Sequence, residues 1–156
     1  MPTIRLEEPA IAARAAKWHP FGLGFRPFFL LAALAGVILL ALWLWLRTRG
    51  FAAAEYYGPI GWHSHEMLFG YAVAVMAGFL LTAVRNWTGQ PTLRGAPLAA
   101  LAALWVAGRI VPWATVPALF VALVDLAFRP LLALSLVRSL WAGANRVNRV
   151  FVPLLL

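Results

Sequence analysis

Long stretches without a charged side chain constrain this sequence more than any other feature. Residues 28–46 carry no charge, and a helix of that length, at ~1.5 Å per residue, approaches the ~30 Å hydrocarbon core of a bilayer. Three further stretches of similar length are also strongly apolar, although the last contains two charged residues. These stretches lie at about 67–84, 96–113 and 117–137. The sequence therefore predicts an all-α fold, a polytopic transmembrane helix bundle with four complete spans.

The composition excludes the ordinary soluble classes. Hydrophobic residues make up 63% of the chain and charged residues 12%, against about 45–50% and about 25% in globular proteins. The net charge of +8 comes from basic residues scattered between apolar segments rather than gathered in one patch, so we expect no nucleic-acid partner. The expected partner is the lipid bilayer. The chain has no cysteine, which excludes disulfides and thiolate metal sites.

The apolar stretches divide the chain into two parts. Residues 1–27 form a polar N-terminal segment, and residues 28–156 form the transmembrane helical domain. The final apolar run, 150–156, is too short to cross a bilayer, which needs about 20 residues. We interpret it as the start of a fifth helix that has been cut short, and we expect missing C-terminal helices to complete the bundle; a re-entrant end is the alternative.

Lysine and arginine are distributed unequally between the loops. Those before the first span, between spans two and three, and after span four all fall on one side, and the positive-inside rule makes that side cytoplasmic. We therefore predict a multi-pass protein with a cytoplasmic N-terminus. Arg109 lies near the end of the third span, where we expect its side chain to snorkel to the opposite surface.

The segment before the second span concentrates groups that bind metals. His63, His65 and Glu66 lie where a loop is expected to enter the membrane, and ionisable groups at that depth are usually functional. Neutral imidazole is the commonest protein ligand for transition metals and haem iron. The alternative is an interfacial cluster in which the histidines hydrogen-bond to headgroups and water.

Local geometry decides whether the two histidines can share a metal. In an extended segment His63, His65 and Met67 would face one way and offer nitrogen and sulfur ligands suited to copper, with Met67 the weaker candidate. In a helix, His63 and His65 would point about 200° apart, so only one could face a given cofactor. Glu66 is expected to act behind the ligands by orienting an imidazole.

The third histidine, His19, precedes the first span and should lie on the cytoplasmic side, across the membrane from the other two. It cannot ligate the same metal as they do. A haem with two histidine ligands from different helices therefore needs a second ligand from absent helices or from another copy of the chain.

Other charged and small residues have structural or functional interpretations. Asp125 and Arg129 are four residues apart on the fourth span and are expected to form an intramembrane ion pair, structural or part of a proton path. Arg26 opens the first span and is expected to anchor lipid or to pair with an anionic group such as a haem propionate. The small residues at positions 70, 74 and 78 predict close packing against a neighbouring helix.

Four stretches of the sequence resemble the NnrS family of bacterial inner-membrane proteins. They cover residues 22–30, the run Trp62-His-Ser-His-Glu-Met-Leu-Phe-Gly-Tyr71, residues 77–84 leading into Asn86-Trp-Thr-Gly89, and residues 123–128. The resemblance extends over most of the chain from Gly22 onward. Because that family is longer, the chain resembles its N-terminal part.

This resemblance implies a membrane protein of the bacterial inner membrane that contains haem and copper and takes part in the response to nitric oxide. It makes His63 and His65 the candidate metal ligands. We see no phosphate-binding glycine loop and no Ser/His/Asp set, so we assign no catalytic residue and leave enzymatic activity open. The alternatives are a proton or ion pathway, a structural subunit of a larger membrane complex, or a non-functional truncated fragment.

Overall fold

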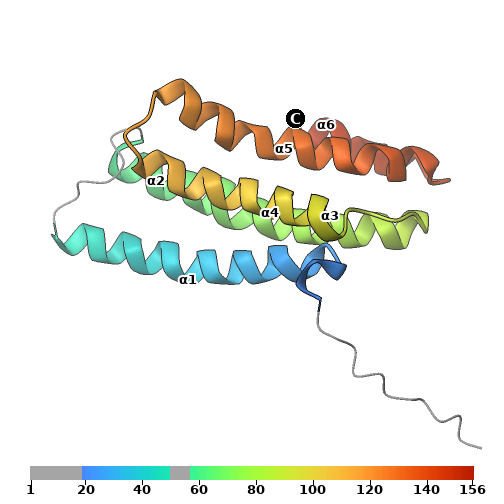
Figure 1. Ribbon diagram of the computed structural model, residues 1–156, viewed down its shortest axis with the longest axis horizontal. Helices are drawn as coiled ribbons and strands as arrows, with labels where there is room; N and C mark the ends of the chain where they lie inside the picture. Colours follow the sequence, from blue (N-terminus) through green and yellow to red (C-terminus); the bar gives the residue numbers. More distant parts are fainter. Residues whose placement is uncertain (1–18, 50–56) are drawn as a thin grey trace, which may run out of the picture.

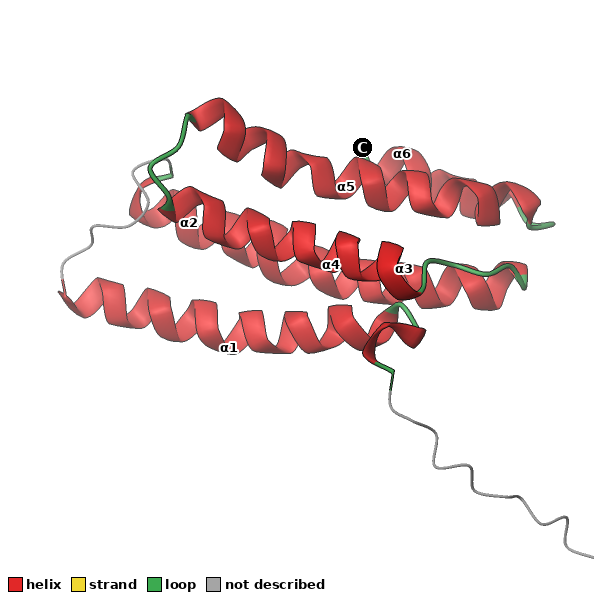
Figure 2. Ribbon diagram, in the orientation of Figure 1, coloured by secondary structure: helices red, strands yellow, loops and turns green. Residues whose placement is uncertain are grey.

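The chain folds into antiparallel helices that lie side by side, as the computed structural model shows (Figure 1). The structure describes residues 19–49 and 57–156, and every regular element among them is helical (Figure 2). The principal helices are α1 (Phe25–Arg49), α2 (Gly58–His65), α3 (Val73–Thr88), α4 (Gly95–Ile110), α5 (Ala118–Ala142) and α6 (Phe151–Leu155). The predicted all-α bundle is confirmed.

Short segments complete these helices. A π-helical segment, Glu66–Ala72, joins α2 to α3 without a break, and we refer to it as the π segment. Short 3-10 segments occur at Pro20–Gly22, Val111–Trp113 and Arg146–Val150. Four helical stretches are long and apolar enough to cross a membrane: Phe25–Arg49, Ile60–Thr88, Gly95–Trp113 and Ala118–Ala142. Among the described residues, these four helices are those expected of a multi-pass membrane protein, as predicted.

The second span begins well before the predicted residue 67. Gly58 and Pro59 are residue types common in loops, but here they open helix α2. Proline suits the first turn of a helix because its missing N–H has no partner there in any case. The helix therefore runs through both histidines. The fourth span also continues past residue 137 to Ala142, and the final apolar run forms the short helix α6 against α5.

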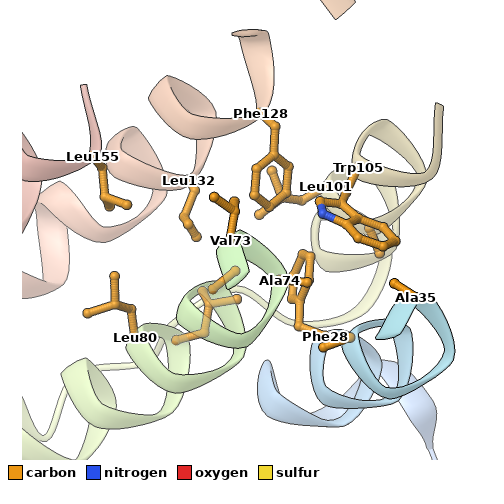
Figure 3. Close-up of a cluster of buried hydrophobic side chains, with 14 of the residues drawn as sticks. Phe28, Ala35, Val73, Ala74, Leu80, Leu101, Trp105, Phe128, Leu132 and Leu155 are labelled. Carbon is orange, nitrogen blue, oxygen red and sulfur yellow. The ribbon is translucent and has the colours of Figure 1, made fainter. Parts of the chain in front are cut away.

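Aromatic and aliphatic side chains fill the space between the helices (Figure 3). Phe28 of α1 meets Phe128 of α5 edge to face, with 5.7 Å between ring centroids, and Leu101 and Trp105 of α4 are buried beside them. The outward faces remain strongly apolar, for example at Val37 and Leu119, which are 71% and 70% exposed. Such surfaces suit lipid as the surrounding solvent.

Small residues allow α1 and the second span to approach closely. Gly70, Ala74 and Gly78 are all buried, and a Cβ at Gly78 would lie 3.0 Å from Phe29 of α1. The predicted packing role of this face is confirmed.

Candidate functional site

Helix α2 presents its two histidines to different neighbours. The ring of His63 stacks on Trp43 of α1, with 4.4 Å between centroids and 8° between planes. The ring of His65 stacks instead on Tyr57, at 4.3 Å, and lies 5.0 Å from Phe69. Because the segment is helical, the extended arrangement that would point both histidines and Met67 toward one copper ion is not formed.

His65 bridges two carboxylates through its two ring nitrogens. Its Nε2 lies 2.8 Å from Asp125 Oδ2 of α5, and its Nδ1 lies 3.3 Å from Glu66 Oε1. The hydroxyl of Tyr57 is also within hydrogen-bonding distance of Nε2, at 3.2 Å. Both nitrogens of His65 therefore already have polar partners within the chain.

Arg109 of α4 joins the same network from a third helix. Its guanidinium pairs with Asp125 through Nη2, and its Nε lies 3.0 Å from Glu66 Oε2 as an ion pair without a well-aligned hydrogen bond. Glu66 has no exposed surface, and the side chains of Arg109 and Asp125 are about 10% exposed. We call these four residues, His65, Glu66, Arg109 and Asp125, the buried network.

Arg109 does not snorkel as predicted. A guanidinium that reaches two buried carboxylates and a carbonyl is better compensated inside the bundle than at its rim, since lone charges in hydrocarbon are costly. One signal in the sequence could have identified this residue, because it is a single charge in an otherwise apolar span. Its partners lie on other helices, which spacing along one chain does not reveal.

The π segment creates an acceptor for Arg109. The N–H of Val73 donates to the carbonyls of Gly70 and Leu68 rather than to that of Phe69, its partner in a regular α-helix. Arg109 Nη1 donates to the Phe69 carbonyl at 2.7 Å. The Phe69 carbonyl thus accepts a hydrogen bond from Arg109 in place of the one it would accept from Val73 in an α-helix. π-helical turns often occur at functional sites.

Two glycines make room for the carboxylates. A Cβ at Gly70 would lie 2.8 Å from Glu66 Oε2, and a Cβ at Gly108 would lie 3.1 Å from Asp125 Oδ1. The first distance is shorter than real contacts allow, so no other residue fits at Gly70 without moving Glu66. Gly70 thus has a second role beyond the helix packing predicted for it.

The predicted ion pair between Asp125 and Arg129 is replaced by another arrangement. Asp125 pairs with Arg109 and His65, and the guanidinium of Arg129 lies over the ring of Phe69, 5.2 Å from its centroid. Arg109 and His65 contact the two carboxylate oxygens of Asp125, one each, and so take the place predicted for Arg129. Arg129 lines a cavity of about 10 Å³ together with Arg109 and Asp125 of the network.

The buried network lies near one end of the bundle. Asp125 is about 10 Å along α5 from its first residue, and Arg109 is about 6 Å from the end of the third span, at ~1.5 Å per residue. That end is formed by the start of α2 and the turn between α4 and α5 (Figure 1). His19 precedes α1 and lies at the opposite end, so it cannot join His63 or His65.

His63 differs from His65 in its hydrogen bonding. Its Nδ1 is buried and has no hydrogen-bond partner in the part of the chain that the structure describes. Met67 follows one turn later and is half-buried against the core. Within the described residues, no group of three or more histidine and acidic side chains has the spacing of a metal site.

Arg26 lies far from this region, in the first turn of α1. Its Nη1 donates to the carbonyl of His19 at 3.0 Å. The bond ties the segment before α1 to the helix. Whether Arg26 also contacts lipid or a propionate remains a prediction.

Comparison with known proteins decides the family. The family model described as NnrS protein matches residues 19–156, nearly the whole chain. The chain belongs to the NnrS family. Searches of curated proteins and of solved structures found no match. The NnrS match includes every residue of the buried network, together with His63.

Proposed function

We propose that this NnrS-family chain binds haem in the bacterial inner membrane through His63 and takes part in the response to nitric oxide. The observation that carries the proposal is the buried Nδ1 of His63, which lacks a hydrogen-bond partner within the described ranges 19–49 and 57–156. A buried polar atom without a partner is costly, and coordination or a bound group would compensate it. The NnrS resemblance supplies the expectation of haem and nitric oxide.

The chemistry of the available donors favours haem over copper. Haem supplies four nitrogen ligands of its own and needs only one or two from protein, whereas a copper site needs several protein ligands that converge. The described residues offer no such convergent group. A second axial ligand, if one is used, would come from another copy of the chain or from further helices.

The surrounding residues have positioning roles in this proposal. Trp43 fixes the plane of the His63 ring by stacking on it. Glu66 contacts His65, so it orients that imidazole, while His65 holds the helices together through Asp125. When bound, haem iron would supply an open position at which nitric oxide can coordinate. We assign no catalytic step to the chain.

Optical spectra of the purified full chain test this proposal. We expect a Soret band that shifts on reduction with dithionite and again on addition of nitric oxide. His63→Ala should abolish the band, and the matched variant His19→Ala should keep it, because His19 lies at the other end of the bundle. A chain without haem, or a His63→Ala variant that still binds haem, would contradict the proposal.

A second candidate function is a proton pathway, because the imidazole of His65 touches a carboxylate through each nitrogen. In this case Asp125→Asn should abolish proton flux across liposomes that contain the protein. The described spans contain no further carboxylate or histidine between the network and the opposite end of the bundle. For this reason we favour a structural role for the network, and proton flux in the unmodified chain would reverse that preference.

A further inference from the structure

The end of the bundle opposite the buried network contains a cavity of about 290 Å³. It lies between the start of α1, the last turns of α3 and the loop that leads into α4. Its polar lining includes Arg85, Asn86, Thr92 and Arg94, and its apolar lining includes Leu23 and Leu81. The cavity therefore combines two cations with an apolar wall.

The two arginines have no acidic partner in the described part of the chain. Its acidic side chains, Glu66 and Asp125, both belong to the buried network near the other end. Arg85 is half-buried in the last turn of α3, and Arg94 directly precedes α4. Two guanidinium groups on one cavity, with no carboxylate side chain beside them among residues 19–49 and 57–156, favour an anionic ligand.

The wall of the cavity is held in place by hydrogen bonds. Thr92 Oγ1 donates to the carbonyl of Leu81 at 2.7 Å, which ties the loop before α4 to α3. Ser139 Oγ of α5 donates to the carbonyl of Pro91 at 2.9 Å. The loop is thus fixed to two helices, so Arg94 is presented at a defined place and a ligand would not need to order it.

The position of the cavity along the helices favours a lipid headgroup as the anion. Arg85 lies one turn from the end of its span and Arg94 lies at the start of the next, which is the depth of lipid headgroups. Basic pockets between transmembrane helices bind the headgroups of acidic lipids. We propose that this cavity binds the phosphate of an anionic phospholipid, with Leu23 and Leu81 against the glycerol and the upper acyl chain.

Thermal unfolding of the full chain in detergent, with added lipid, tests the proposal. The fluorescence of the tryptophans provides the signal. We expect phosphatidylglycerol to raise the melting temperature in a saturable way and phosphatidylcholine to leave it unchanged. An equal effect of the two lipids would overturn the proposal, and so would inorganic phosphate that produces the full effect alone, since the site would then bind the free anion.

Substitution of the two arginines tests whether phosphatidylglycerol acts at this cavity. Arg85→Gln/Arg94→Gln should weaken the response to phosphatidylglycerol at least tenfold. The matched control Arg47→Gln/Arg49→Gln removes two exposed arginines at the other end of the bundle and should respond as the unmodified chain does. If the first double variant fails to fold, Arg94→Gln alone, at an exposed position, should still weaken the response. An unchanged response in Arg94→Gln, together with an unchanged lipid count by native mass spectrometry, would overturn the assignment.

Discussion

Glu66 has no exposed surface, so its charge has to be compensated inside the bundle. The compensation comes from Arg109 and His65 at 3.0 and 3.3 Å, and the space for it comes from the missing side chain of Gly70. At the scale of single residues, the buried network therefore depends on the small size of Gly70 as well as on its charged groups.

Gly70→Ala should destabilise the protein by about 1–3 kcal/mol, the usual cost of overpacking a tight interior. The added Cβ would meet Glu66 Oε2 at 2.8 Å and push the carboxylate away from Arg109. Gly61→Ala is a matched control, because a Cβ there meets only Tyr57 at an ordinary 3.7 Å. Thermal unfolding in detergent measures both, and equal melting temperatures would contradict the role assigned to Gly70.

Asp125→Asn should cost about 3–5 kcal/mol, as expected when one partner of a buried ion pair is removed. Arg129→Gln, on the same helix but outside the network, should cost less. In a double-mutant cycle, Asp125→Asn and Arg109→Gln should be strongly non-additive, with a coupling of about 0.5–3 kcal/mol. Additive effects would show that the two residues do not stabilise one another.

At the scale of elements, the π segment sets the orientation of the network. It carries Glu66 and Gly70, and its irregular bonding leaves the Phe69 carbonyl to Arg109. A π-helical turn amounts to one extra residue in an α-helix, so its removal would turn α2 by about 100° relative to α3. His65 and Glu66 would then face away from α4 and α5.

Deletion of Leu68 tests this role. Its side chain is 60% exposed, so little packing is lost with it. The deletion should lower the melting temperature much more than Leu68→Ala does, because it shifts the register of two network residues. Similar melting temperatures for the deletion and the substitution would mean that the π segment does not position the network.

The sequence predicted the elements better than the contacts between them. Hydropathy alone located four spans, because lipid requires long apolar helices. It placed the start of the second span too late, since Gly58 and Pro59 suit a helix N-terminus as well as a loop. The pairing of Asp125 with Arg129 was inferred from their spacing on one helix, but Arg109, on another helix, is the partner. Such contacts depend on how helices pack, and no local pattern encodes them.

At the scale of the whole molecule, a cytoplasmic N-terminus predicts that the α3–α4 loop faces the cytoplasm and that the α4–α5 turn faces the other side of the membrane. The loop that contains Gln90 and the turn that contains Thr115 lie at opposite ends (Figure 1). Because the chain has no cysteine, single cysteines can report on each end without background.

In intact cells, Thr115→Cys should react with a membrane-impermeant maleimide, and Gln90→Cys should react only after the cells are broken open. The arginine distribution provides the reason, since loops rich in basic residues stay in the cytoplasm. Labelling of Gln90→Cys, but not of Thr115→Cys, in intact cells would reverse the topology.

The charge on α4 also has a consequence for biosynthesis. Arg109 places a charge in the last turn of α4, and an arginine opposes entry of a nascent helix into lipid. Only a short turn separates α4 from α5, which brings Asp125. We therefore expect the translocon to release α4 and α5 into the bilayer together, as a hairpin in which Arg109 and Asp125 are already paired.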